Sequence, residues 1–496
     1  MRNRKSALRH ICAEILLSCI LLSLATALLH GEEDPGQTAK SERAILSAPQ
    51  SELAVAMREI PVWEVHERVR SSFLESPYCS TNRQAHLGIR YPAVRSSTPA
   101  YGQIDRADLG LTHLDSKGNR LGGLFLVLDQ SEAGSDHYDL LYFDENADGD
   151  LMNDKPRRLL RDVPQGLLVK EGSFARRTWF EPVQVMLGSP GTDRRMIELL
   201  PCLWTYGDQP PLVLFVPAKV HTGRLDVDGK FYEAFLGYRY TISASLNEPS
   251  SALRLVSQDG RRVNYQGTEQ LNAMRFLGDK YYRFSCTPTG DKLFVQPYTG
   301  PLGVLEPGTG NREIKGLQMM GVLCTKEFVV GIGYPLDEKG PPQAATRYKI
   351  PVGDYYPLRF VSVYPGKLRF TFSNGYYGDG ASQMRMAGNP ACGIKIREDK
   401  PFMLDFSNKP VVSFARPGKN DRLFLGGEVR VEAVLLDPVL GIMIRGLADL
   451  TRTEKRPYRT PFVQKPTYDW APSLDPKVTI TRANGAIVAE GVIPFG

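Results

Sequence analysis

Residues 223–235 read Gly-Arg-Leu-Asp-Val-Asp-Gly-Lys-Phe-Tyr-Glu-Ala-Phe, and this stretch decides the fold class of the chain. Segments 223–227 and 230–235 carry strand-forming residues, and Asp228-Gly229 lies between them. Asp-Gly between two such segments is a strong signal for the tight turn of a β-hairpin. The stretch therefore predicts an antiparallel hairpin.

The same pattern of short apolar segments and turn residues repeats along the chain. Segments 281–286 and 292–297 flank the turn residues 287–291, and segments 478–481 and 486–489 lie around Asn484-Gly485. Asn-Gly is the preferred pair for a type I′ turn, because both residues tolerate positive φ. The 496 residues include 46 Gly and 36 Pro, which interrupt helices and mark turns. We therefore predict a mainly β protein of several antiparallel β-sheet or sandwich domains, with little helix.

One helix and one domain of a known β type are also expected. A helix is predicted near Val55–Leu74, with an interruption at Pro61. Near the other end, apolar residues alternate with charged ones along the long strand predicted at Gly427–Leu436. From about residue 416 to the end we expect an immunoglobulin-like sandwich, without the Cys…Trp…Cys core of antibody domains.

The chain is too long for one hydrophobic core and is expected to form several domains. Residues 1–27 combine a basic start, an apolar run at Ile15–Leu24 and the small residues Ala25-Thr26-Ala27, which is typical of a cleaved signal peptide. An uncleaved membrane anchor is the alternative. The remaining expected units are a disordered linker at 28–54 and four β domains at 55–175, 176–317, 318–415 and 416–496.

Composition and cysteine usage limit the possible classes. The chain is 42% hydrophobic and 23% charged, as expected for a globular protein. Its net charge of +6 comes with scattered arginine pairs, and a nucleic-acid-binding surface would instead cluster them. Five cysteines follow the predicted signal, far apart and without a C-x-x-C pair, which favours buried free thiols over a disulfide framework: Cys79, Cys202, Cys286, Cys324 and Cys392.

One loop carries a chemically specific motif. The apolar segments 124–128 and 138–143 predict two strands, and the second ends directly on the sequence Asp-Glu-Asn-Ala-Asp-Gly-Asp-Leu-Met-Asn-Asp-Lys at 144–155. Oxygen-bearing side chains at positions 1, 3 and 5 and a Gly at position 6 are typical of a calcium loop of the EF-hand or dockerin type. The loop departs from an EF-hand at position 12, where Lys155 replaces the bidentate Glu.

Five residues are therefore predicted to hold one calcium ion. Asp150 is expected to act through its backbone carbonyl, and Asp154 is expected to replace the missing Glu. Leu151, at position 8, is expected to turn into the core. The competing interpretation is an Asx-rich turn that uses these residues only for their backbone tolerance. The complete predicted set is Asp144, Asn146, Asp148, Asp150 and Asp154.

Other chemistry has little support in the sequence. G-x-S-x-G, H-E-x-x-H and Walker A patterns are absent. His137 lies near the loop and is interpreted as a surface histidine. Adjacent tyrosines such as Tyr281-Tyr282 could stack on a sugar, but neighbours on a strand point to opposite faces, so one ring is expected in the core and one outside.

Three segments give a resemblance to a known group of proteins. Residues 142–150, 352–357 and 488–496 are similar to segments of large, uncharacterised, secreted β-rich proteins of planctomycete-type bacteria. The resemblance implies export and a calcium loop, and it implies no established activity. Such relatives often have a second Asp-rich loop after a segment similar to 230–234, whereas residues 235–240 contain no carboxylates here.

Two functions remain open from the sequence. The first is an exported, non-enzymatic, multidomain β-protein with one structural calcium ion, which acts in adhesion, scaffolding or binding of a protein or glycan at the cell envelope. It would meet a membrane only if the N-terminal segment stays attached. The second is a secreted hydrolase acting on polysaccharide, with carboxylates assembled from distant strands, since such pairs leave no local spacing signal.

Overall fold

The computed structural model describes residues 52–492 with internal gaps. The gaps are 75–77, 83–88, 97–98, 105–123, 133–134, 136, 169–175, 188–194, 206–210, 239–241, 249–250, 264–268, 309–316, 334–346, 359–360, 365–366, 375–391, 417–431, 458–466 and 476. The predicted signal peptide at 1–27 and nearly all of the predicted linker at 28–54 lie outside the described residues.

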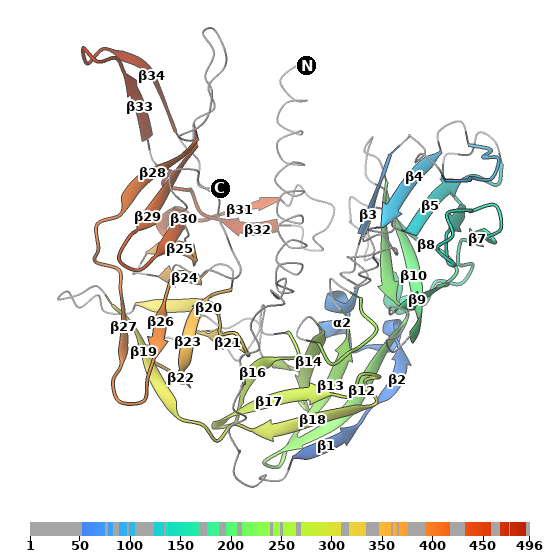
Figure 1. Ribbon diagram of the computed structural model, residues 1–496, viewed down its shortest axis with the longest axis horizontal. Coiled ribbons are helices and arrows are strands. Elements are labelled where there is room, and N and C mark those ends of the chain that lie inside the picture. Colours follow the sequence, from blue (N-terminus) through green and yellow to red (C-terminus); the bar gives the residue numbers. More distant parts are fainter. Residues whose placement is uncertain are drawn as a thin grey trace, which may run out of the picture.

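The fold is mainly β, as predicted. Figure 1 shows the strands of all the sheets following an open arc, from β3–β11 on one arm, through β12–β18 at the base, to β19–β30 on the other arm. The longest sheet has thirteen strands. Along this sheet the order is β1 (Leu53–Ala56), β18 (Lys292–Pro297), β17 (Lys280–Cys286), β16 (Ala273–Leu277), β21 (Val329–Ile332), β20 (Gln318–Cys324), β24 (Val361–Tyr364), β25 (Leu368–Asn374), β30 (Ile442–Asp449), β29 (Glu432–Asp437) and β28 (Val411–Arg416), with β23 (Gly353–Pro357) and β26 (Ile394–Ile396) beside it.

A nine-stranded sheet carries the predicted calcium loop. Its order is β7 (Arg157–Arg158), β6 (Leu140–Phe143), β5 (Leu124–Asp129), β4 (Ala100–Ile104), β3 (Tyr78–Asn82), β11 (Leu212–Pro217), β10 (Arg195–Thr205) and β8 (Arg176–Trp179), and β9 (Val183–Leu187) also pairs with β10. Strand β5 pairs with β4 on one side and β6 on the other, and five of its six residues are buried, on both faces, which explains its almost wholly apolar sequence.

Four smaller sheets complete the described strands. The five-stranded sheet contains β15 (Arg262–Val263), β14 (Ala252–Ser257), β13 (Lys230–Gly237), β12 (Lys219–Val227) and β2 (Arg58–Pro61), and the three-stranded one contains β22 (Tyr348–Pro351), β19 (Leu302–Gly308) and β27 (Phe402–Asp405). Two hairpins remain, β31 (Glu454–Pro457) with β32 (Thr467–Trp470) and β33 (Lys477–Thr481) with β34 (Ile487–Val492).

The hairpin predicted around Asp228-Gly229 is confirmed. Strands β12 and β13 pair in register from His221↔Leu236 to Val227↔Lys230, and Asp228 and Gly229 have φ values of 48° and 77°. The hairpin at the C-terminal end also forms, but its predicted type I′ turn is wrong. Only Gly485 has positive φ, and the register shifts by one residue between Ile480 and Thr481. The N–H of Gly485 instead donates to the carbonyl of Arg482, so the turn spans residues 482–485 next to a bulge in the ladder.

The predicted helix at Val55–Leu74 is wrong over its first half. The described helices are η1 (Val62–Glu64), α2 (Glu67–Phe73), η2 (Gln165–Leu167) and η3 (Leu450–Arg452), and α2 alone is α-helical. Segment 53–61 forms β1, which pairs with β18, and β2, which pairs with β12. These ladders join segments more than 150 residues apart in the sequence, and their backbone bonds outweigh a weak helix propensity.

The expected domain divisions do not coincide with sheet edges. Strands on both sides of residue 175 share the nine-stranded sheet, and β19 pairs with β22 and β27 across residue 317. The immunoglobulin-like sandwich from residue 416 is not confirmed. In the described part of 416–496, β29 and β30 extend the longest sheet, and the other strands form the two separate hairpins. Residues 427–431 of the predicted long strand lie outside the described residues.

Neighbouring tyrosines on β17 point to opposite faces of the strand, and both faces are buried. Tyr281 and Tyr282 are both buried, in different hydrophobic clusters, so the expectation that one ring points outside is wrong. Their hydroxyls donate to the carbonyl of Lys349 and to the carboxylate of Asp228, at 2.9 and 2.8 Å. Four of the five predicted free thiols are confirmed as free and buried, and burial raises the pKa of each to about 12: Cys202, Cys286, Cys324 and Cys392.

Candidate metal centre

The predicted calcium loop begins where β6 ends. Phe143 is buried in the sheet, and the next residue, Asp144, is only 1% exposed. Leu151, at position 8, is fully buried, as predicted from its place in the motif. Asp144 at its start and Leu151 in its middle are buried, whereas the other residues of the loop are half-buried or exposed, and the chain then continues into the short strand β7.

Asp144 organises the turn from its first position. Its two carboxylate oxygens accept hydrogen bonds from the backbone N–H groups of Asp148, at 3.0 Å, and Gly149, at 3.2 Å. The backbone reverses through positive φ at Ala147, 61°, and at Gly149, 77°. Burial raises the pKa of Asp144, and the N–H groups that it accepts from oppose that shift.

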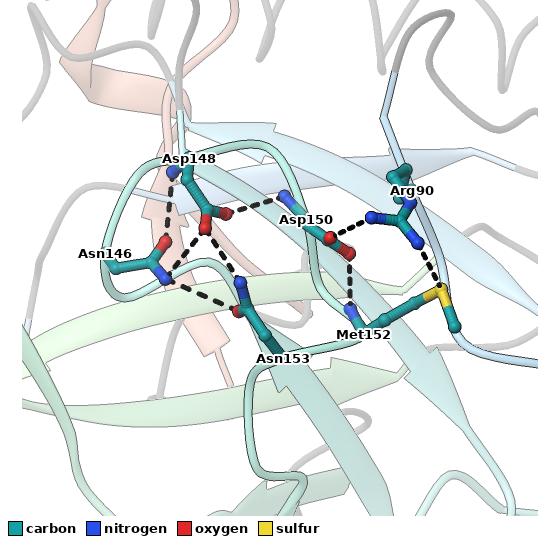
Figure 2. A network of polar contacts seen from close by, with 6 residues as sticks. All are labelled: Arg90, Asn146, Asp148, Asp150, Met152 and Asn153. Atoms are coloured by element: carbon teal, nitrogen blue, oxygen red, sulfur yellow. Dashed lines mark hydrogen bonds and ion pairs between the residues drawn. The ribbon is translucent and has the colours of Figure 1, made fainter.

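The third and fifth positions form a network with a residue that the motif does not include. Figure 2 shows the side chains of Asn146, Asp148 and Asn153 pointing toward one another. The Nδ2 atoms of Asn146 and Asn153 donate to Asp148 Oδ2 at 3.1 and 2.8 Å. The bond from Asn153 is the largest cause of the lowered pKa of Asp148, so this carboxylate stays ionised.

Asp154 has the least satisfied carboxylate of the loop. Its Oδ2 atom is buried and has no hydrogen-bond partner. Burial, followed by the negative charges of Asp144, Asp148 and Glu145, raises the pKa of Asp154 to about 6. A carboxylate near three others without a cation of its own is costly, and a bound cation would remove that cost.

Asp150 makes contacts through both its side chain and its backbone carbonyl. Its side chain accepts from the N–H of Met152 at 3.1 Å and forms an ion pair with Arg90, whose Nη1 lies 2.5 Å from Oδ2 (Figure 2). Its backbone carbonyl, which was expected to face the ion, accepts from the N–H of Asn153 at 3.3 Å. The side chain of Asp150 therefore faces Arg90, which leaves its carbonyl as the group that the motif assigns to calcium.

Three residues at the loop were missed by the sequence argument. Asn153 lies inside the motif, and its amide type was a usable signal that the spacing rule ignores. Arg157 contacts Glu145 through Nε at 2.9 Å and through Nη2, which offsets one of the negative charges near Asp154. Arg90 is 60 residues from Asp150 in the sequence, and no local sequence pattern predicts a contact over that separation.

The side chains of the loop, as they lie, do not form a complete metal site. Among the described residues, no three His, Cys, Asp or Glu side chains are grouped closely enough to hold a metal ion as they lie. Calcium prefers six to eight oxygen ligands, including amide and backbone carbonyl oxygens and water. The unpartnered Asp154 Oδ2 and the convergent Asn146 and Asp148 fit that ligand chemistry, and closure on an ion requires their hydrogen bonds to exchange.

The remaining candidate groups do not join the loop. His137 is exposed, and its Nδ1 lies 3.2 Å from the hydroxyl of Ser135. The structure therefore agrees with a surface position for this histidine.

Of the helices in the described ranges, none is sufficiently long and apolar to cross a membrane. No protein-family model, no curated protein and no solved structure matches this chain.

Proposed function

We propose that this chain is an exported, non-enzymatic β-protein in which loop 144–154 binds one structural calcium ion. The observation that carries the proposal is the buried Asp154 Oδ2, which lacks a hydrogen-bond partner beside Asp144 and Asp148. Side-chain oxygens of Asp144, Asn146, Asp148 and Asp154 and the carbonyl of Asp150 would hold the ion. Calcium would neutralise their repulsion and supply no catalysis.

The fold favours a structural role for such an ion. The loop connects β6 to β7 at the edge of the nine-stranded sheet, and Asp144 and Leu151 within it are buried. Extracellular calcium modules bind with dissociation constants of about 10⁻⁴–10⁻³ M. Calcium in tenfold excess over the dissociation constant would stabilise the folded state by only about 1.4 kcal/mol. The ion would fix one loop and leave the rest of the fold intact.

Export and a role at the cell envelope complete the proposal. They rest on the signal-like residues 1–27, whose basic start and apolar run precede small residues. Adhesion, scaffolding, or binding of a protein or glycan would suit a long β-protein with a calcium-fixed edge. Mass determination of the chain recovered from outside an expressing cell tests this part, and a first residue near 28 supports it. A chain retained inside the cell with Met1 intact contradicts it.

Thermal unfolding tests the calcium assignment. In millimolar calcium the wild-type protein should melt several degrees higher than in EGTA, because the ion binds the folded loop. Asp148→Asn keeps an acceptor oxygen for Asn153 but removes a charge, and it should abolish the difference. Asp162→Asn removes a charge from an exposed residue outside the loop and should retain it. An equal calcium effect in both variants would refute the assignment to this loop.

A further inference from the structure

Residues 89–96 run beside the candidate calcium loop and are called here the strap. At one end, the N–H of Arg90 donates to the carbonyl of Gly149 at 3.0 Å, and the N–H of Leu151 donates to the carbonyl of Arg90 at 2.9 Å. Together they form a one-residue parallel bridge between Arg90 and Asp150. The side chains of the same two residues form the ion pair seen in Figure 2.

The other end of the strap is fixed by a different element. Asp129, the last residue of β5, is buried, and its carboxylate accepts from the backbone N–H of Arg95 at 3.0 Å and of Ser96 at 2.8 Å. Asp129 pairs with Leu140 at the start of β6, whereas the loop follows the end of β6. The strap therefore spans the β5–β6 pair from the calcium loop to the opposite end.

The two attachments differ in strength. The Asp129 end has charged hydrogen bonds to a buried carboxylate, which are strong. The loop end has two backbone bonds and an ion pair in which Arg90 is 67% exposed and Asp150 22% exposed, and such a pair contributes little by itself. The loop groups of the bridge belong to Gly149 and Leu151, on either side of the Asp150 carbonyl. Whatever fixes the backbone at Asp150 therefore also fixes the bridge to the strap.

We propose that calcium strengthens the attachment of the strap: an ion bound in the loop fixes the backbone that holds Arg90, and without the ion this attachment opens more often. The inference rests on the proposed calcium site and adds its consequence for a second segment. Without the cation, the repulsion among Asp144, Asp148 and Asp154 loosens the loop backbone that carries the bridge. The strap then opens more often at Arg90 and stays attached at Asp129.

Limited trypsin digestion with peptide mass mapping reads both ends of the strap, because trypsin cleaves after Arg90 and after Arg95. At calcium tenfold above its dissociation constant, cleavage after Arg90 should slow about tenfold relative to EGTA, since the open population falls by that factor. Cleavage after Arg482, in the exposed turn of the β33–β34 hairpin, is the internal control and should not change.

Asp129→Asn separates a local attachment from general stabilisation. It weakens the far attachment, so cleavage after Arg95 should become fast in calcium and in EGTA, while the protection of Arg90 by calcium persists. Calorimetry on the same samples distinguishes the two ways of failing. Calcium binding without protection of Arg90 would overturn the strap proposal alone. No calcium binding heat would overturn it together with the proposed function.

Discussion

Arg254 and Glu269 form an ion pair inside the protein. Nη2 of Arg254 lies 2.9 Å from Oε2 of Glu269, and the two side chains are 1% and 2% exposed. Arg254 also donates to the hydroxyl of Ser72 on α2 and to the carbonyl of Glu269, at 3.0 and 3.1 Å. Arg262 contacts the second carboxylate oxygen of Glu269. The pair thus ties α2 to the five-stranded sheet.

Removing one partner of this pair should strongly lower the free energy of unfolding. Glu269→Gln would leave the guanidinium of Arg254 buried beside a neutral amide, and breaking a buried ion pair in this way costs about 3–5 kcal/mol. Urea unfolding should show that loss. The control is Asp259→Asn, which breaks the ion pair between Asp259 and Arg261, both more than half exposed. It should leave stability unchanged, and equal losses in the two variants would contradict a special role for burial.

Asp154→Asn should reverse the sign of its effect between two conditions. In EGTA it should raise the melting temperature, because the negative charges of Asp144, Asp148 and Glu145 no longer oppose a buried carboxylate. In millimolar calcium it should lower the melting temperature, because a charged ligand is lost. A fall of the same size in both conditions would show that Asp154 supports the fold by another contact.

A buried histidine should make stability depend on pH. Burial lowers the pKa of His221 below its ordinary 6.5; Glu59 and Asp291 oppose that shift, and Arg195 and Lys219 add to it. The unfolded chain therefore binds a proton that the folded chain rejects. Stability should be constant above pH 6.5 on this account and should fall as the pH drops below it. Urea midpoints between pH 5 and 7.5 should show a shallower slope for His221→Gln, and identical slopes would contradict the assignment.

Two glycines separate backbone conformation from packing. A Cβ added to Gly229 or to Gly393 would meet no atom within 4 Å, but only Gly229 has positive φ. Gly229→Ala should therefore destabilise by about 1 kcal/mol, the cost of placing an L-residue in that conformation. Gly393→Ala should be neutral, or stabilising by up to about 1 kcal/mol. Urea unfolding of the two variants measures the difference, and equal effects would contradict the type I′ turn at 228–229.

Local signals explain which parts of the fold the sequence predicted. Asp228-Gly229 lies within the hairpin that it specifies, and Asp144, Asn146 and Asp148 lie within the loop that they shape, so short spacing suffices. The helix predicted at 55–61 failed because β1 and β2 find their partners in β18 and β12, far along the chain. At Asn484-Gly485 only Gly485 has positive φ, so the dipeptide alone did not fix the turn type.

The candidate site divides in the same way. The spacing of the motif predicted the oxygen donors and the inward turn of Leu151, and the burial of Leu151 is confirmed. The spacing did not reveal that the Asp150 side chain pairs with Arg90, or that Arg157 contacts Glu145. Both arginines belong to other segments, and their positions depend on how the nine-stranded sheet brings those segments together.

Calorimetric titration of the purified chain with calcium shows directly whether loop 144–154 binds the ion. We expect heat that fits about one ion per chain, lost in Asp148→Asn and retained in Asp162→Asn, with a dissociation constant of about 10⁻⁴–10⁻³ M or tighter. Absence of binding heat in the wild-type protein at millimolar calcium would contradict this expectation. Residues 144–154 would then be a polar turn stabilised by their own hydrogen bonds.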